Sequence, residues 1–167
     1  MTGTSPIRNA AIRTARVDDV PVIVSLIREL ADYEREPDAV EATESDIRAA
    51  LFGETPAAFC HVAEHDGEVV GFALWFLNFS TWKGRHGIYL EDLFVRPAAR
   101  GTGLGKALLT TLIDLARERG YGRVEWSVLD WNTPAIEFYN SLGARPMDEW
   151  TVWRLDGDAL NPTPPNQ

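Results

Sequence analysis

The stretch Arg100-Gly-Thr-Gly-Leu-Gly105 lies between an apolar strand candidate at residues 88–95 and an amphipathic helix candidate that begins near Leu104. A glycine-rich turn at the start of a helix exposes several backbone N–H groups, which together form a site for a phosphate or a similar anion. The spacing excludes two well-known anion loops. A Walker loop would need glycine at Arg100, and the dinucleotide-binding fingerprint would need glycine at Lys106. The alternative is a glycine turn that only lets strand and helix pack closely.

The charge distribution favours the anion-binding interpretation. The 167-residue chain carries a formal net charge of −9 and a sequence pI of about 4.8, which argues against nucleic acid as a partner. Between residues 93 and 113, however, there is no Asp or Glu, while Arg96, Arg100 and Lys106 are basic. We interpret the absence of carboxylates from this stretch of an acidic protein as an indication that it binds an anion.

Length and composition indicate one domain with an ordinary core, since 45% of the residues are hydrophobic. No apolar run approaches the roughly 18 residues of a membrane span, and no signal-peptide segment is visible at the N-terminus. The single cysteine, Cys60, excludes an internal disulfide framework and is typical of a reducing compartment. We therefore expect a cytoplasmic protein without a membrane partner.

The periodicity of apolar residues predicts a chain that alternates between strands and helices. We expect a disordered N-terminus at residues 1–10, one folded domain at 11–157 and a disordered tail at 158–167. The predicted strands are residues 11–16, 59–64, 69–79, 88–95, 124–129 and 150–155, and the predicted helices are residues 18–35, 43–51, 104–119 and 133–142. Asp66-Gly67 predicts an antiparallel hairpin, whereas the strand–helix–strand unit across the glycine turn needs a parallel pair. The sheet is therefore expected to be mixed.

This order of elements, together with the Arg-x-x-Gly-x-Gly turn, resembles the GNAT superfamily of acetyl-CoA-dependent N-acetyltransferases over residues 12–156. Finer matches resemble its spermidine/spermine acetyltransferase branch, most closely the thialysine N-acetyltransferase members: Tyr33-Glu34 and residues 80–85 (STWKGR), 88–92 (IYLED) and 128–132 (VLDWN). The resemblance implies an α/β (α+β) GNAT fold, with a mixed, mostly antiparallel sheet of six to seven strands, a central parallel pair and helices on both faces. It also implies acetyl-CoA as cosubstrate, no metal and a homodimer.

Acetyl transfer to an aliphatic amine needs a proton acceptor, because an amine with a pKa near 10.4 must lose a proton before it can attack. Glu91 and Asp92 are adjacent carboxylates in an otherwise apolar strand. Their side chains point to opposite faces of a regular strand, so both can enter one cleft only if the strand bulges there. The resemblance implies that Glu91 is a water-linked base or an anchor for the amine. Two surface carboxylates on a strand are the alternative.

A proton donor for the departing thiolate is the second requirement, and a tyrosine with a pKa near 10 can supply that proton at pH 7. Tyr139 matches the family's general-acid tyrosine, although spacing alone favours a core aromatic. Asn132 precedes the same helix and could also cap it. The resemblance implies that acetyl-CoA is held by Leu93, Phe94, Val95, Arg100, Gly101, Thr102, Gly103, Leu104, Gly105, Lys106, Asn132, Pro134, Ala135 and Tyr139.

The amine pocket is expected to be narrow, with aromatic walls and carboxylates at its end. Its candidate residues are Tyr33, Glu34, Trp82, Glu91, Asp92 and Trp153. Ser80 stands where the polyamine-acetylating members have an acidic residue, which shifts the expected substrate toward a short diamine or a lysine-like amine. The expected reaction is direct attack by this amine in a ternary complex. Polyamine acetylation, acetylation of a protein amino group and a non-catalytic acyl-CoA-binding module are the alternatives.

Overall fold

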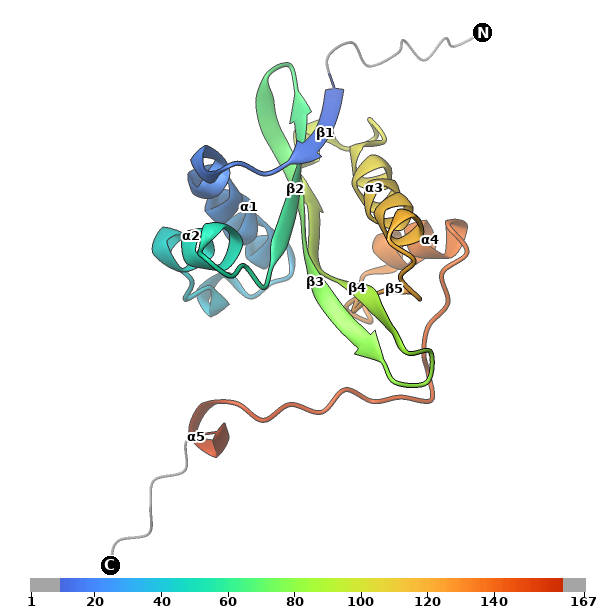
Figure 1. Ribbon diagram of the computed structural model, residues 1–167. Helices are drawn as coiled ribbons and strands as arrows, with labels where there is room; N and C mark the ends of the chain where they lie inside the picture. The colour runs from blue at the N-terminus through green and yellow to red at the C-terminus, as the bar shows by residue number, and fades with distance from the viewer. Residues whose placement is uncertain (1–9, 161–167) are drawn as a thin grey trace, which may run out of the picture. The chain divides into compact units, whose positions relative to one another are not determined.

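The computed structural model describes residues 10–160, and the chain divides between Ser127 and Val128 into two compact units. The first unit is a sheet with helices on both faces, and the second contains two short helices (Figure 1). We describe each unit by itself. The termini predicted to be disordered, residues 1–10 and 158–167, lie outside the described residues except for Ala10 and residues 158–160.

The first unit is built on a five-stranded sheet in the order β1-β2-β3-β4-β5. Its strands are β1 (Ala10–Thr14), β2 (Phe59–His65), β3 (Glu68–Ser80), β4 (Arg85–Val95) and β5 (Val124–Trp126). Neighbouring strands are antiparallel except β4 and β5, which are parallel. The predicted mixed, mostly antiparallel sheet with a parallel pair is therefore confirmed. The pair lies at one edge of this sheet, not at its centre.

The prediction of six to seven strands was wrong, because the described residues contain five. The missing strand was expected at residues 150–155, which carry no regular secondary structure. Its apolar side chains are exposed, from 65% for Leu155 to 92% for Trp153. A strand needs a ladder partner as well as apolar, β-prone residues, and sequence composition reports only the second property. Strand β5 is also shorter than predicted, since it ends at Trp126.

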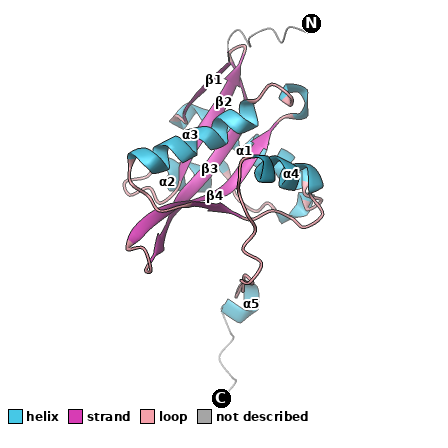
Figure 2. Ribbon diagram, turned by 90° about the vertical axis from the view of Figure 1, so that its right-hand side faces the viewer, coloured by secondary structure: helices cyan, strands magenta, loops and turns pink. Residues whose placement is uncertain are grey.

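Helices cover both faces of the sheet, as predicted. Helices α1 (Val20–Tyr33) and α2 (Glu44–Phe52) lie on one face and α3 (Leu104–Glu118) on the other, and Figure 2 shows α3 crossing in front of the strands. Thr43 starts α2 with a capping box, in which Oγ1 accepts from the Asp46 N–H at 3.2 Å. Three 3-10 turns, Val17–Asp19, Pro37–Ala39 and Pro97–Ala99, complete the first unit.

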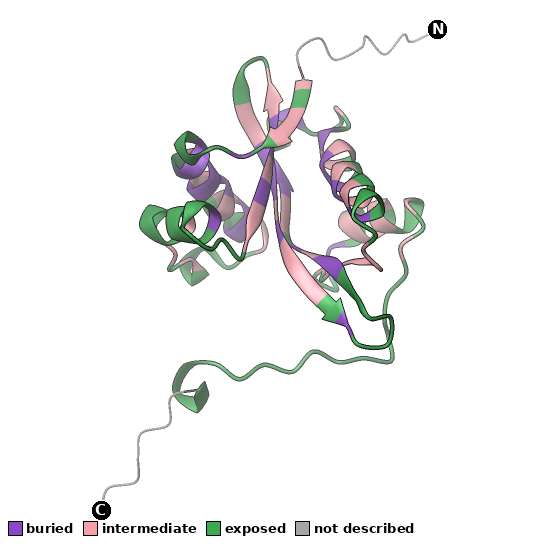
Figure 3. Cartoon of the chain, viewed as in Figure 1, coloured by how far each residue is buried: buried purple, intermediate pink, exposed green. Residues whose placement is uncertain are grey.

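The core lies on both sides of the sheet (Figure 3). On the α1 side, Ile23 and Leu26 pack with Val62, Phe72 and Phe94. On the other side, α3 presents three fully buried leucines, Leu108, Leu109 and Leu112. Each such side chain contributes about 1.5–3 kcal/mol relative to an exposed position, so α3 is firmly held along its length. Its N-terminal turn is thereby fixed relative to β4.

The second unit contains α4 (Thr133–Ser141) and the short α5 (Gly157–Leu160). Asn132 caps α4 as predicted, since its side-chain oxygen accepts from the Ala135 N–H at 3.4 Å. Pro134 lies in the first turn, where a missing N–H costs nothing. Across the described part of the chain, no helix has both the length and the apolar character needed to cross a membrane.

Candidate active site

A β-bulge in β4 lies at Glu91. Leu74 of β3 pairs with Asp92, but the next residue, Trp75, pairs with Leu90, so Glu91 has no partner on β3. The bulge breaks the alternation of side chains along β4, which is the condition under which two adjacent carboxylates can serve one site.

Strand β4 also loses its other neighbour at this point. The parallel pairing with β5 covers Ile88, Tyr89 and Leu90 only. From Glu91 to Val95 no strand of the described chain pairs with β4 on that side, while β3 continues on the other. Backbone groups that face this side are left for other partners. An extended chain carrying amide groups is one ligand that such an edge can bind.

Three carboxylates gather at the bulge. Burial and the charge of Glu91 raise the pKa of Glu34, at the end of α1. Burial first, and then the charges of Glu91 and Glu34, raise the pKa of Asp92 to about 7. Glu91 itself is exposed, whereas Glu34 and Asp92 are partly buried. The structure thus brings together Glu34, Glu91 and Asp92, which we call the carboxylate cluster.

The glycine turn at the start of α3 has the geometry of an anion site. Gly101 and Gly103 have φ angles of 78° and 82°, and a Cβ built on either residue meets nothing within 4 Å. Gly103 is the N-cap, no side chain caps the helix, and its first turn has no acidic residue. The N–H groups of Leu104, Gly105 and Lys106 have no partner within the helix, so they can bind a phosphate oxygen. Thr102 stabilises the turn by donating from Oγ1 to the Ala99 carbonyl.

The three basic residues of this region have different roles. Arg96 pairs with Glu29 of α1 at 2.8 Å, so its charge is already matched. Arg100 donates from Nε to the Val95 carbonyl at 3.0 Å, and its guanidinium lies 5.0 Å from the Tyr33 ring centroid and 5.6 Å from that of Phe94. Lys106 is exposed and has no ion-pair partner within residues 10–160. The Glu29–Arg96 pair could not be predicted from the sequence, because no local pattern relates two positions that are 67 residues apart.

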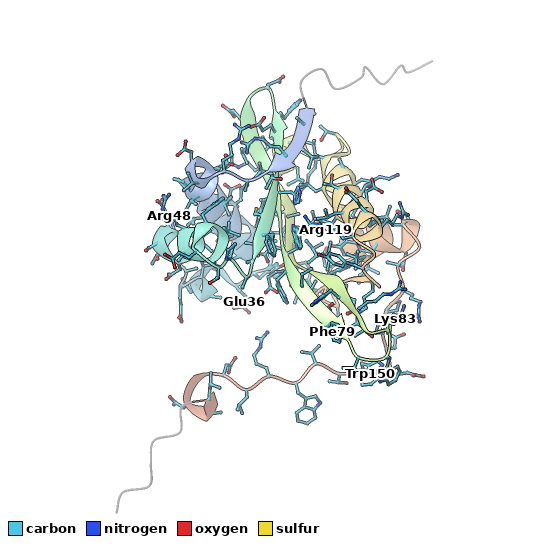
Figure 4. The ribbon with its side chains drawn as sticks, viewed as in Figure 1. Glu36, Arg48, Phe79, Lys83, Arg119 and Trp150 are labelled. Atoms are coloured by element: carbon cyan, nitrogen blue, oxygen red, sulfur yellow. The ribbon has the colours of Figure 1, made fainter. Side chains whose placement is uncertain are left out.

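Trp82, a predicted pocket residue, and Ser80 lie at the turn end of the β3–β4 hairpin. Trp82 is 90% exposed in the turn between Ser80 and Arg85. Ser80 is six residues beyond Leu74, the partner of Asp92, which is about 20 Å along a strand. The Ser80 oxygen accepts from the Lys83 N–H at 3.3 Å, and so stabilises the turn. Figure 4 shows Phe79 and Lys83 at this outer end of the hairpin.

The remaining candidates belong to the second unit. Tyr139 is partly buried on α4, with its ring centroid 5.4 Å from that of Phe138. Asn132, Pro134 and Ala135 form the capped start of the same helix. Trp153 is 92% exposed in the segment without regular structure.

The residues present fit a pyrophosphate-containing cosubstrate. The turn offers unpaired N–H groups, open space beside two glycines and an unpaired lysine. The described residues contain no group of three or more His, Cys, Asp or Glu side chains arranged to hold a metal ion. The carboxylate cluster instead presents negative charge that a bound ammonium would neutralise.

The glycine turn, the carboxylate cluster and the unpaired edge of β4 all lie in the first unit. The acetyltransferase (GNAT) family matches residues 23–144, and the chain belongs to that family. It is an N-acetyltransferase. GNAT acetyltransferases use acetyl-CoA, which agrees with the anion site at the turn.

Among its relatives is the thialysine N-epsilon-acetyltransferase of Bos taurus, 42% identical over 160 residues that cover 89% of this chain and 94% of that protein. The L-ornithine N5-acetyltransferase NATA1 of Arabidopsis thaliana is 34% identical and covers 89% of this chain and 85% of its own length. The expected similarity to the thialysine and spermidine/spermine branch is therefore confirmed.

Solved structures share the fold. An integron cassette protein from the mobile metagenome of V. cholerae superposes with a TM-score of 0.78 at 29% identity, covering 92% of this chain and 96% of that one. An aminoglycoside acetyltransferase from an uncultured soil metagenomic sample reaches 0.73 at 19% identity, covering 88% and 97%. At that identity the likeness shows the fold alone.

Proposed function

We propose that this enzyme transfers the acetyl group of acetyl-CoA to a primary amine of a small diamine or lysine-like substrate, by direct attack in a ternary complex. The carboxylate cluster is the observation that carries this proposal. Burial and then the charge of Glu91 raise the pKa of Glu34, and burial and then the charges of Glu91 and Glu34 raise that of Asp92, so an incoming ammonium group stabilises the cluster. Acid side chains thus act both as the anchor of the amine and as the acceptor of its proton.

The cosubstrate is proposed to bind along β4. The N–H groups after Gly103, with Lys106, hold the pyrophosphate, and the β4 edge at Leu93, Phe94 and Val95 faces the extended arm. Acetyl-CoA, when bound, supplies an acetyl thioester as the electrophile. Backbone N–H groups of β4 at this edge stabilise negative charge on the acetyl oxygen. The β3 side of the same strand remains in the sheet, which keeps these donors fixed.

Two carboxylates can accept the amine proton. The family resemblance implies Glu91, which is exposed at the bulge and can act through water. Asp92 has the pKa of about 7 that suits a base working near neutral pH. Activity against pH separates the two. If Asp92 is the acceptor, Asp92→Asn abolishes the acid limb of kcat/KM near pH 7, whereas Glu91→Gln shifts that limb to lower pH because it removes a neighbouring charge.

The second unit is proposed to supply the proton for the leaving thiolate from Tyr139, with Asn132, Pro134 and Ala135 holding the cosubstrate arm. Residues 11–157 would then act as one acetyltransferase domain. A homodimer in the cytoplasm is the setting that the family resemblance implies. Trp82 and Trp153 remain proposed aromatic contacts for the amine, supplied from the hairpin and from the segment after α4.

The proposed substrate is short. Glu34 of the cluster follows Tyr33 at the end of α1. Relatives named for thialysine and ornithine act on amino acids with one side-chain amine. The Ser80 position carries less weight than its sequence context indicated, because Ser80 is the last residue of β3 and accepts a hydrogen bond from the hairpin turn.

One experiment tests the proposal: kcat/KM for thialysine, lysine, ornithine, putrescine, spermidine and spermine in one buffer, with free thiol as the readout. Thialysine or another lysine-like amine should lead the series. If spermine leads, the polyamine alternative replaces this proposal. Glu34→Gln is the matched variant, and it should lower kcat/KM for every amine while KM for acetyl-CoA stays unchanged.

A further inference from the structure

A cavity of about 240 Å³ lies at the opposite end of α3 from the glycine turn. Its lining includes Phe52, Phe59, His61, Trp75, Leu115 and Arg119. All of them belong to the first unit. No member of the carboxylate cluster and no residue of the glycine turn lines it, so this cavity is separate from the acetyl-transfer site.

One wall of the cavity is aromatic. The rings of Phe59 and Trp75 stack with their centroids 4.7 Å apart and their planes at 30°. The His61 ring continues the stack, 6.1 Å from that of Trp75 and at 23° to it. Trp75 is only 2% exposed, so the wall is held rigidly by the sheet. Stacked rings of this kind offer a face for another flat ring.

His61 presents one defined hydrogen-bond donor. The Trp75 Nε1–H group donates to His61 Nδ1 at 3.1 Å, so Nδ1 carries no proton and the neutral ring keeps its proton on Nε2. Burial, and then the charge of Arg119, lower the pKa of His61 and keep the ring neutral at pH 7. The Nε2–H group is therefore available to an acceptor.

Arg119 supplies a permanent positive charge. It is the C-cap of α3, it is exposed, and it has no ion-pair partner among residues 10–160. No Asp or Glu lines the cavity. Cys60, which also lines it, remains an uncharged thiol because burial, and then the charges of Asp19 and Asp92, raise its pKa to about 12. The cavity thus combines an apolar aromatic wall, one cation and one neutral donor, with no carboxylate in its lining.

We propose that this cavity binds a small aromatic carboxylate. The ring of the ligand packs against Phe59 and Leu115, while its carboxylate accepts hydrogen bonds from Arg119 and from His61 Nε2–H. The cavity volume is below the 300–1,000 Å³ or so of drug-sized sites, which limits the ligand to about one ring with a short acidic side chain. The charge preference is opposite to that of the carboxylate cluster, so an amine substrate does not bind here.

Calorimetry with phenylacetate and its neutral amide, phenylacetamide, tests the proposal on the unmodified protein. Phenylacetate should bind with a dissociation constant on the order of 1 mM or tighter, and phenylacetamide at least about tenfold more weakly. The Trp75 indole N–H resonance, assigned with Trp75→Phe, should shift with phenylacetate. Absence of binding, or equal binding of acid and amide, overturns the proposal.

Two arginine variants locate the site. Arg119→Gln should weaken phenylacetate binding by about tenfold. Arg117→Gln, on the same helix and paired with Asp114 at 3.0 Å, should leave binding unchanged. Unaltered binding in Arg119→Gln, or full displacement of phenylacetate by saturating CoA, would place the ligand elsewhere. Binding is measured without turnover, so this result is independent of the amine that the enzyme acetylates.

Discussion

The guanidinium of Arg100 lies 5.0 Å from the centroid of the Tyr33 ring. This contact joins the end of α1, which carries Glu34 of the carboxylate cluster, to the turn that begins α3. Arg100 also donates from Nε to the Val95 carbonyl at the end of β4. One side chain therefore connects three elements of the proposed acetyl-transfer site.

Arg100→Lys should destabilise this connection. A lysine has no planar guanidinium to stack on Tyr33 and cannot reproduce the Nε geometry toward Val95. We expect a loss of about 1–2 kcal/mol in the free energy of unfolding and a severalfold rise in KM for acetyl-CoA. Thermal unfolding and steady-state kinetics measure the two effects. Arg117→Lys, exposed on α3, is the control, and equal behaviour of the two variants would show that Arg100 has no special role.

Gly103→Ala should impair acetyl-CoA binding beyond its effect on stability. Gly103 has a φ of 82°, and Gly120 has a φ of 69°; a Cβ added to either meets nothing within 4 Å. Alanine in the left-handed region costs about 1–2 kcal/mol at both positions. Only Gly103→Ala should also raise KM for acetyl-CoA, because only there does the methyl group enter the proposed pyrophosphate site. An equal KM in both variants would exclude the turn as the anion site.

Asp92→Asn should stabilise the protein above pH 7. Because the pKa of Asp92 is raised to about 7 in the folded state, the folded protein holds a proton that the unfolded chain releases near pH 4. The contribution of Asp92 to stability therefore decreases as the pH rises from about 4 to 7. Removing the carboxylate should add about 2–4 kcal/mol to the free energy of unfolding at pH 8 and little at pH 4.

Denaturant unfolding at both pH values checks this pH dependence of stability. Asp32→Asn, at an exposed aspartate of α1, is the control and should change neither value. A destabilised Asp92→Asn at pH 8 would mean that the carboxylate is held by a favourable partner, contrary to the cluster described above.

Asp19→Asn should have the opposite pH dependence. Arg13 donates to both carboxylate oxygens of Asp19, at 2.7 and 2.9 Å, and these bonds hold the pKa of Asp19 below its usual value. The stabilisation is present above about pH 4 and is lost as the pH falls through the folded-state pKa. We expect Asp19→Asn to lose about 2–3 kcal/mol at pH 7. Asp18→Asn, exposed and adjacent, should lose almost nothing in the same unfolding assay.

Tyr139→Phe should lower kcat while leaving acetyl-CoA binding nearly intact, because it removes a proton donor and keeps the ring. A loss of about 10²-fold in kcat is typical for a general acid. Single-turnover kinetics with calorimetric CoA binding separate the two effects. Phe138→Leu, at the neighbouring aromatic, is the comparison for a purely structural change. If Tyr139→Phe kept the wild-type kcat at every pH, Tyr139 would have a packing role and would not be the general acid.

Most of the fold could be predicted from local patterns. The hairpin at Asp66-Gly67, the caps at Thr43 and Asn132 and the apolar face of α3 each depend on residues that are close in sequence. The strand predicted at 150–155 failed because pairing depends on a partner that composition does not report. The same limit applies to the edge position of the parallel pair.

The residues of the site could be predicted from the sequence, but their contacts could not. The glycine turn and the Glu91-Asp92 pair follow from motif and resemblance, but their electrostatics depend on Glu34, 57 positions before Glu91. The motif match at Trp82 does not report exposure: this aromatic residue belongs to a matching motif, and its side chain is exposed on the hairpin turn. The His61 donor was invisible in sequence, because the Trp75 indole that fixes its tautomer lies 14 residues away on the neighbouring strand.

The bulge at Glu91 gives β4 one more residue than its pairing with β3 requires. Leu90 and Asp92 are two positions apart and would share a face of a regular strand, yet they pair with adjacent residues of β3 and so face opposite sides. Because Glu91 is the extra residue of the bulge, deleting it would restore a regular strand in which Leu90 still pairs with Trp75 and Asp92 with Leu74. The other side chains of β4 would keep their faces, and the cluster would lose one carboxylate. The bulge is therefore the means by which β4 carries a second carboxylate without a change in its register with β3.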